Sequence, residues 1–164
     1  MPPALTRRDA LALAALLPAA PAIAATPDLA ALFREYGARG ALVVVDGATG
    51  EATTSDGTRA GLRLVPASTF KIPNSLIAFE SGVVADADTV LPYGGGPTMV
   101  PAWARDMSLR EAMPISNVPI FQEVARRVGL ARYRDWLARL DYGNRDPGTV
   151  VDRFWLDGPL RISA

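Results

Sequence analysis

Histidine and cysteine are absent from this chain, and lysine occurs only once, at Lys71. Without histidine, Ser-His-Asp and Cys-His catalysis are excluded, and zinc sites lose one of their usual ligands. Without cysteine there are no disulfides, no thiol nucleophile and no thiolate-bound metal. Any general base in this protein must therefore be a carboxylate, Lys71 or a less usual group.

Net charge is lacking too, because 17 basic residues balance 17 acidic ones. This balance gives no electrostatic case for nucleic acid as a partner. Asp86 and Asp88 lie close together, but two carboxylates without further oxygen ligands are more typical of solvated charge than of a cation site. We therefore expect no metal, no cofactor and no nucleic-acid partner, and nothing in the sequence indicates an oligomeric state. The 164 residues, 49% of them hydrophobic, suffice for one domain with a core.

The N-terminus has the pattern of an export signal. A positive region at 6–8 precedes a short apolar stretch at 10–17, and Ala-Ile-Ala at 22–24 is a small-x-small cleavage pattern. We expect residues 1–24 to be a signal peptide, residues 25–164 the mature chain and the periplasm its location. The paired arginines also hint at twin-arginine export. An amphipathic N-terminal helix is the alternative, and no apolar run is long enough for a stable membrane anchor.

Hydrophobic spacing predicts a mainly helical chain with one early hairpin. A strand-like apolar run at 41–45 is followed by turn residues at 46–50 and by a returning strand at 51–54. A capping-box pattern opens a short helix at 108–111, and an apolar stretch at 150–156 favours a strand. Helical spacing predicts longer helices at 27–36, 68–81, 118–128 and 131–140.

Ser68 and Lys71 form the most informative pair in the chain. Side chains at positions i and i+3 share one face of a helix, so the hydroxyl and the amine come within reach of each other. A neutral lysine can take a proton from the serine, whereas arginine is effectively always protonated. The alternative is that Ser68 caps the helix and Lys71 is a charged surface residue, which the helix dipole disfavours.

Three further segments allow either a structural or a catalytic interpretation. Ser116 and Asn117 precede a predicted helix, where such residues usually cap, although a second serine can also shuttle a proton. Tyr-Gly-Asn at 142–144 is by default a turn, because glycine and asparagine tolerate positive φ. Phe154 and Trp155 are by default a core pair.

Taken together, these segments resemble the class D (oxacillinase-type) serine β-lactamases. The resemblance rests on four motifs in order: Ser-Thr-Phe-Lys at 68–71, Ser-Asn-Val at 116–118, Tyr-Gly-Asn at 142–144 and Phe-Trp-Leu-Asp-Gly-Pro-Leu-Arg-Ile-Ser at 154–163. It implies an α/β (α+β) fold of the serine β-lactamase and penicillin-binding transpeptidase type. Residues 25–164 would be the N-terminal portion of that domain, with the helical region and first hairpin but without most of the sheet.

The resemblance also implies a role for individual residues. Ser68 would be the acylated nucleophile that opens a β-lactam, and Lys71 would be carboxylated by CO₂ to give the general base. Ser116 would pass a proton to the β-lactam nitrogen, and the Ser68 backbone N–H would supply half of the oxyanion hole. The Trp155 indole N–H would hydrogen-bond the carbamate, in a pocket lined by Phe70, Val118 and Trp155.

One feature of the family is missing from the sequence. Class D enzymes have a later Lys-Thr/Ser-Gly strand, and this chain has no second lysine. We therefore expect the 164-residue chain by itself to be poorly active or inactive. The alternatives are a penicillin-sensing domain that stays acylated, a cell-wall D,D-peptidase that shares the S-x-x-K motif, and an inactive gene remnant.

Overall fold

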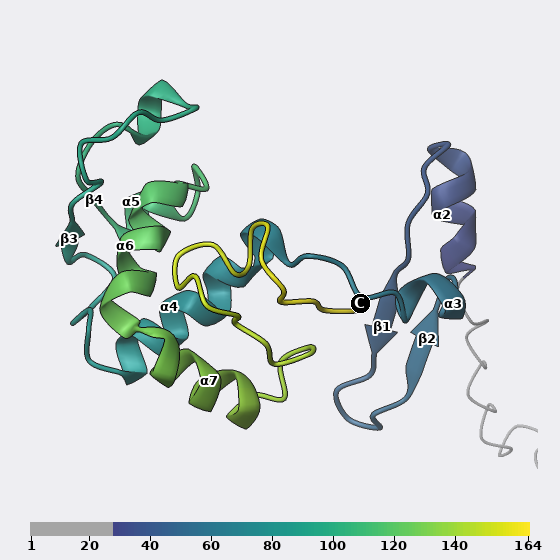
Figure 1. Ribbon diagram of the computed structural model, residues 1–164. Coiled ribbons are helices and arrows are strands. Elements are labelled where there is room, and N and C mark those ends of the chain that lie inside the picture. Colours follow the sequence, from purple (N-terminus) through teal and green to yellow (C-terminus); the bar gives the residue numbers. More distant parts are fainter. Residues whose placement is uncertain (1–27) are drawn as a thin grey trace, which may run out of the picture.

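The computed structural model describes residues 28–164, so the predicted signal peptide at 1–24 lies outside the described part. The chain forms two parts, an N-terminal part around a hairpin and a larger helical body (Figure 1). The segment after residue 60 joins them, and the C-terminal residues return to the same place. There Leu64 and Ile162 form an antiparallel bridge.

The N-terminal part contains α2 (Leu29–Glu35), β1 (Val43–Val45), β2 (Ala52–Thr54) and α3 (Gly57–Ala60). Asp28 begins α2 by accepting a hydrogen bond from the Ala31 backbone N–H at 3.1 Å. The strands pair antiparallel, with Val44 opposite Thr53. The helix and hairpin expected from the sequence are therefore confirmed.

The helical body is built on α4 (Lys71–Glu80), which packs against α6 (Val118–Val128). A 3₁₀ turn, η1 (Ala67–Phe70), leads into α4, so the predicted helix at 68–81 is present but begins as a tighter turn. Gly129 ends α6 at a φ of 82° and α7 (Leu130–Arg139) follows directly. The helices expected at 118–128 and 131–140 are thus confirmed.

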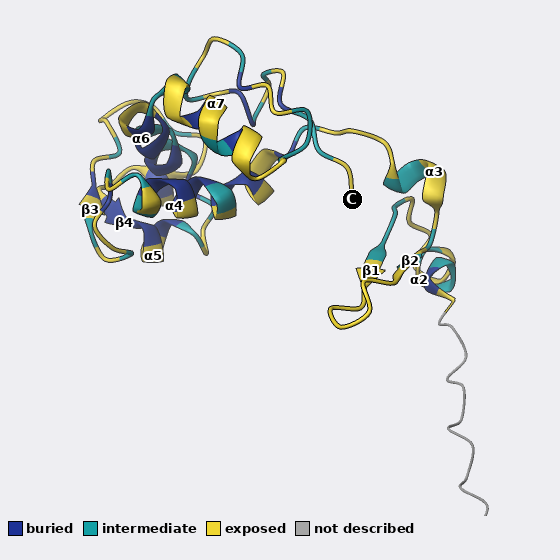
Figure 2. Ribbon diagram, turned by 90° about the horizontal axis from the view of Figure 1, so that it is seen from below, coloured by how far each residue is buried: buried dark blue, intermediate teal, exposed yellow. Residues whose placement is uncertain are grey.

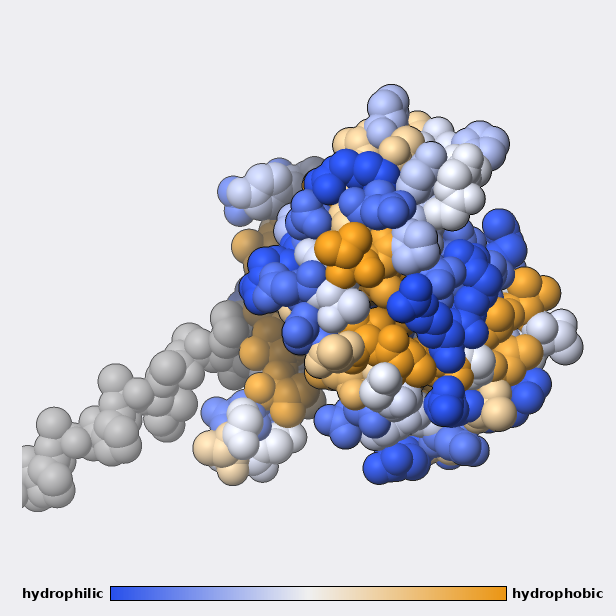
Figure 3. Space-filling view, turned by 90° about the vertical axis from the view of Figure 1, so that its left-hand side faces the viewer, coloured by the Kyte–Doolittle hydropathy of each residue, from blue (hydrophilic) through white to orange (hydrophobic). Residues whose placement is uncertain are grey.

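Shorter elements close one side of the helical body. A 3₁₀ turn, η2 (Pro101–Trp103), separates β3 (Val90–Leu91) from β4 (Met107–Ser108), and the two strands pair antiparallel. The predicted capping box begins α5 (Leu109–Ala112), where Ser108 and Glu111 each accept a hydrogen bond from the other's backbone N–H. On this side of the molecule, hydrophilic side chains separate the apolar areas from one another (Figure 3).

An aromatic cluster forms the centre of the helical body. Phe70 is fully buried, and its ring contacts the rings of Tyr133, Tyr142, Phe154 and Trp155 at centroid distances of 5.1–6.1 Å. Buried residues concentrate in α4 and α6, whereas most of α3 and the hairpin is exposed or half-buried (Figure 2). The turn that carries Ser68 is therefore held to the core by the buried ring of Phe70, two residues after Ser68.

The strand predicted at 150–156 is wrong, because residues 151–157 form consecutive turns and residue 150 belongs to no strand. Phe154 and Trp155 are each only 1% exposed, although they are neighbours in sequence. A strand would place successive side chains on opposite faces. The turns instead direct both rings into one core, with the Leu156 N–H donating to the Arg153 carbonyl at 2.9 Å.

The described residues thus form a mixed α/β structure with two small two-stranded sheets. This agrees with the predicted α+β class, in which the helices dominate and little sheet is present. Within residues 28–164, no helix combines the length and the apolar character needed to cross a membrane.

Candidate active site

Three polar side chains from distant parts of the sequence meet at the start of α4. The Lys71 Nζ donates hydrogen bonds to the Ser68 Oγ at 2.9 Å and to the Ser116 Oγ at 2.8 Å. The Ser116 hydroxyl in turn donates to the Ser68 Oγ at 3.0 Å. The structure therefore brings together all three residues that the sequence indicated as candidates. Lys71 lies between two hydroxyls in a closed triangle.

Both hydroxyls sit next to strained backbone. Ala67, just before Ser68, has a φ of 48°, and Ser116 itself has a φ of 55°. A non-glycine residue in this region costs on the order of 1–3 kcal/mol and persists only where surrounding contacts hold it. The Ala67 N–H donates to the Trp155 carbonyl at 2.8 Å, and the Ser116 N–H donates to the Met113 carbonyl at 3.1 Å. Neither residue type predicts a positive φ, so this strain was not foreseeable from the sequence.

Lys71 is 1% exposed, whereas Ser68 is exposed. Burial lowers the pKa of the Lys71 amine from its usual value of 10.5, because a charged group is poorly solvated there. None of the ion pairs formed among residues 28–164 includes Lys71. A buried amine next to an accessible hydroxyl is suited to accept a proton from it.

Phe121 belongs to the surroundings of Lys71 but was not predicted from the sequence. Its ring centroid lies 5.6 Å from the Lys71 Nζ, and its side chain is fully buried. Phe121 is three residues after Val118 on α6, so both lie on one face of that helix. This helical spacing from the Ser-Asn-Val segment is the sequence signal that indicates Phe121.

The three residues predicted to line a pocket are less closely grouped. Phe70 and Trp155 stack at a centroid distance of 5.5 Å and are both buried. Val118 is half-buried at the first position of α6, two residues after Ser116. It also lines a hollow of about 440 Å³ that Met99 and Trp103 border.

Asn117 has a structural role, unlike its neighbour. Its side-chain Oδ1 accepts a hydrogen bond from the Ile120 N–H at 3.1 Å and caps α6. Its Nδ2 donates to the Trp103 carbonyl at 3.3 Å, and the residue is fully buried. The capping interpretation of this segment is therefore right for Asn117, while the side chain of Ser116 bonds to Lys71 and Ser68.

The Tyr-Gly-Asn segment at 142–144 is a turn that fastens the C-terminal residues. Asn144 donates from its backbone to the Arg161 carbonyl at 2.9 Å, and its Oδ1 accepts from the Arg161 N–H at 2.8 Å. Gly143 has a φ of 57°, and a Cβ there would collide with the Arg161 carbonyl. The default turn interpretation is thus confirmed.

The carboxylates of the acidic pair near α5 have partners within the protein. Asp88 forms an ion pair with Arg110 at 2.7 Å, and Asp86 accepts hydrogen bonds from the backbone of the same loop. In the part of the chain that the structure describes, no group of three or more acidic, histidine or cysteine residues could hold a metal ion.

Comparison with known proteins identifies relatives of this chain. Residues 40–164 match the family model of the penicillin-binding protein transpeptidase domain. The chain is 41% identical over 132 residues to β-lactamase OXA-5 of Pseudomonas aeruginosa, which covers 80% of this chain and 49% of that protein. It is 45% identical over 132 residues to β-lactamase OXA-48 of Klebsiella pneumoniae, covering 80% of this chain and 50% of that one.

Solved structures give the same result. The fold is similar to the class D β-lactamase FUS-1 (OXA-85) of Fusobacterium nucleatum subsp. polymorphum, with a TM-score of 0.76 and 39% identity over 82% of this chain and 56% of that one. A class D β-lactamase from Bacillus subtilis has a TM-score of 0.74 and 33% identity over 80% and 56% of the two chains. The chain spans about half the length of the curated relatives it matches. It belongs to the penicillin-binding protein transpeptidase family, and its relatives there are class D β-lactamases.

Proposed function

We propose that the protein to which this chain belongs hydrolyses β-lactam antibiotics through a serine acyl-enzyme and so confers resistance. The observation that carries the proposal is the triangle of Ser68, Lys71 and Ser116, in which an accessible hydroxyl meets a buried amine at 2.9 Å. The similarity to proteins named class D β-lactamases supports the same reaction. The substrate class would be β-lactams.

The general base in this proposal is a carboxylated Lys71. The neutral amine adds CO₂ and loses a proton, which gives a carbamate with one negative charge. A lowered Lys71 pKa supports this step, because only the neutral amine reacts. Arginine cannot take this role, since it stays protonated. No metal and no other cofactor is required.

The reaction then proceeds in two stages. The carbamate takes the proton of Ser68 while the Ser68 Oγ bonds to the β-lactam carbonyl carbon. The backbone N–H of Ser68 donates a hydrogen bond to the oxyanion that forms. The ring C–N bond breaks, Ser116 delivers its proton to the nitrogen, and Ser116 recovers the proton that the carbamate took from Ser68, a relay that its hydrogen bonds to Lys71 and Ser68 favour. The carbamate next activates a water molecule, which hydrolyses the acyl ester and frees Ser68.

The apolar surroundings of Lys71 would set the stability of the carbamate. Phe70, Val118 and Trp155 are the residues proposed for this pocket, and Phe121 joins them on the strength of its 5.6 Å distance to the Lys71 Nζ. The Trp155 indole N–H is the donor proposed for the carbamate. Apolar walls favour the uncharged amine and thereby the first step.

The proposed location is the periplasm, reached through a signal peptide at residues 1–24. The paired arginines of that segment leave twin-arginine export open as the route.

A non-hydrolytic penicillin-binding domain is the second candidate. The match to a penicillin-binding protein transpeptidase model favours it, because penicillin-binding proteins share the S-x-x-K motif with β-lactamases. The two candidates differ only in the second stage, so deacylation decides between them.

The experiment is an intact-mass measurement on the protein expressed from its complete reading frame and incubated with a penicillin. Rapid loss of the drug with only a transient adduct supports the hydrolase. A stable adduct on Ser68 indicates a sensor or binder. The absence of both adduct and drug loss contradicts β-lactam chemistry altogether.

A further inference from the structure

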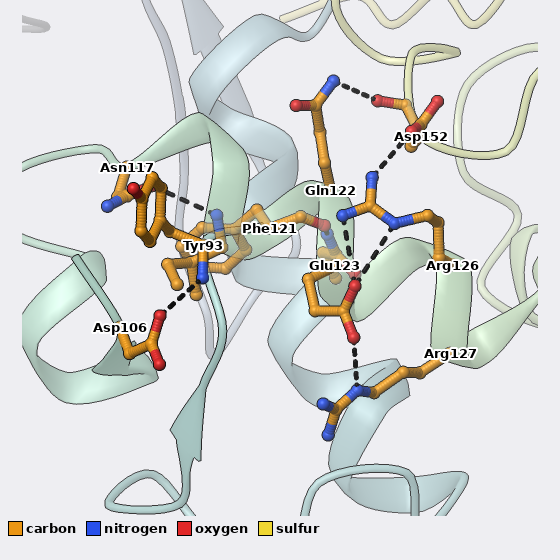
Figure 4. A network of polar contacts seen from close by, with 11 residues as sticks. Tyr93, Asp106, Asn117, Phe121, Gln122, Glu123, Arg126, Arg127 and Asp152 are labelled. Carbon is orange, nitrogen blue, oxygen red and sulfur yellow. Dashed lines mark hydrogen bonds and ion pairs between the residues drawn. The ribbon is translucent and has the colours of Figure 1, made fainter. Parts of the chain in front are cut away.

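Two polar side chains on α6, one of them charged, bind the segment at 150–157 to the helix. The Arg126 Nη1 donates to the Asp152 Oδ2 at 2.8 Å, and the Gln122 Nε2 donates to the Asp152 carbonyl at 3.1 Å (Figure 4). Residue 152 is thus held from α6 through both its side chain and its backbone. Gln122 and Arg126 are one helical turn apart, so they act from the same face of α6.

Glu123 fixes the guanidinium of Arg126 in this position. Its Oε2 accepts from the Arg126 Nε at 3.2 Å and from Nη2 at 3.1 Å, while its Oε1 accepts from the Arg127 Nε at 2.8 Å (Figure 4). The two arginines therefore bind different oxygens of one carboxylate. Arg126 also bonds to Asp152, whereas the ion pair of Arg127 is with Glu123, which makes Arg127 a natural comparison.

The fastened segment reaches the candidate active site within three residues. Trp155 follows Asp152, and its carbonyl accepts the Ala67 N–H at 2.8 Å, directly before Ser68. The segment consists of turns, and side chains of α6 bond to its backbone and side chain at residue 152. The same helix presents Phe121 to Lys71. The contacts to residue 152 therefore act three residues before Trp155 and add to the burial that holds its ring against Phe70.

The contacts between Arg126 and Asp152 contribute little to the stability of the fold, so their main effect is on where the segment at 150–157 lies. The side chains of Arg126 and Asp152 are 44% and 26% exposed. Ion pairs with this much solvent contact contribute about 0–1 kcal/mol to folding. Two N–H groups of Arg126 nevertheless donate to the same Glu123 oxygen, and these charge-assisted hydrogen bonds restrict the geometry of the guanidinium and favour one placement of the segment.

We propose that Arg126, oriented by Glu123 and assisted by Gln122, is a positioning residue that holds Trp155 against the Lys71 pocket through Asp152. This inference rests on the proposed carboxylated-lysine reaction and adds to it the group that keeps one wall of the pocket in place. Arg126 acts through Asp152 and Trp155 and does not touch the reacting atoms.

The test compares Arg126→Gln with Arg127→Gln in the protein expressed from its complete reading frame. Both substitutions remove one positive charge from neighbouring positions that share Glu123 as a partner. The first readout is the bicarbonate concentration that gives half-maximal penicillin turnover, together with the ¹³C signal of the Lys71 carbamate in labelled bicarbonate. The second is the hydrogen-exchange rate of the Ala67 amide, which reports on the contact with Trp155 and is independent of activity.

We expect Arg126→Gln to raise the required bicarbonate roughly two- to fivefold, the size that a half-exposed ion pair supports. Saturating bicarbonate should restore most of the turnover, the Ala67 amide should exchange faster, and Arg127→Gln should resemble the parent. Asp152→Asn should reproduce the effect, and the double variant Arg126→Gln/Asp152→Asn should add little to either single one.

Several outcomes would overturn the inference. Equal effects of Arg126→Gln and Arg127→Gln, or no change in either readout, show that the contact with Asp152 does not place Trp155. If Arg126→Gln does not fold, Asp152→Asn serves as the test. The inference is then wrong if Asp152→Asn has the bicarbonate dependence and the Ala67 exchange rate of the parent protein. If the parent protein gives no carbamate signal, the proposed carboxylated-lysine reaction is wrong. The exchange rate of the Ala67 amide then tests by itself whether Arg126 holds Trp155 in place.

Discussion

At the scale of single residues, the placement of Lys71 is the feature on which the proposed chemistry depends. Its amine is buried, bonded to two hydroxyls, and outside the ion pairs formed by the described residues. Burial without an opposite charge lowers an amine pKa, whereas an adjacent carboxylate would raise it. The first two predictions follow from this environment.

Lys71→Arg should abolish turnover of a penicillin while keeping a positive side chain at the site. The guanidinium cannot lose its proton at neutral pH, so it can neither accept the Ser68 proton nor add CO₂. The measurement is steady-state hydrolysis by the protein from its complete reading frame, with circular dichroism to verify folding. Normal turnover in a folded variant would exclude the proposed base.

The acylation rate should rise with pH and then level off before pH 10.5, the usual pKa of lysine, because burial lowers the pKa of Lys71. Single-turnover acylation by a penicillin across this range would measure the rise.

The stability of the protein should also increase with pH. Between the lowered folded-state pKa and the unfolded-state value, the unfolded chain binds more protons, so the free energy of unfolding increases with pH in that window. Urea unfolding across this range would measure it, and Lys71→Met should lose the slope. An identical slope in the variant would assign the effect to other groups.

At the scale of elements, the segment at 150–157 contacts the turn that carries Ser68, because the Trp155 carbonyl accepts a hydrogen bond from the Ala67 N–H. Trp155→Ala should slow deacylation more than acylation, because it removes both a wall and the proposed donor to the carbamate. Added bicarbonate should partly restore the rate. Pre-steady-state kinetics would separate the two stages. An unchanged ratio of the two rates, with no response to bicarbonate, would argue against this role.

Gly143→Ala should destabilise the protein by about 1–3 kcal/mol or more, because a Cβ at a φ of 57° would also meet the Arg161 carbonyl. Gly50→Ala is the matched control, since Gly50 has a φ of 75° but no other group within 4 Å of the position that a Cβ would take. Thermal unfolding should show the larger loss for Gly143→Ala. Equal losses would mean that only backbone strain matters and that the turn does not fasten residue 161.

At the scale of the whole molecule, the described residues leave apolar surface on a central helix. Ile72 and Leu76 on α4 are 62% and 56% exposed and lie one turn apart. The chain spans only about half the length of the curated relatives that it matches. A polypeptide limited to residues 25–164 should therefore bind a hydrophobic dye strongly and hydrolyse penicillins far below the roughly 1–10³ s⁻¹ typical of enzymes. Ordinary turnover by that polypeptide would refute this expectation, and Ile72→Glu/Leu76→Glu should reduce the dye binding.

Some of the fold follows from local sequence alone. Asp28, the Ser108 capping box, Pro119 and Gly129 specify helix ends through short-range hydrogen bonds and fixed dihedral angles, so those helices were predictable. The segment at 150–156 was not, because its apolar residues are equally typical of a strand. Its turns come from the burial of two adjacent rings against Phe70, which is a long-range effect.

The sequence by itself determined the chemical inventory of the protein. With no histidine, no cysteine and a single lysine, it limited the general base to few groups, and the order of its motifs indicated the family. Only the tertiary structure decided how those groups meet. The contact between Lys71 and Ser116 spans 45 positions in the chain, Phe121 approaches the amine from α6, and the contacts of Arg126 reach Asp152. Such contacts depend on how helices and turns pack, and local spacing does not encode them.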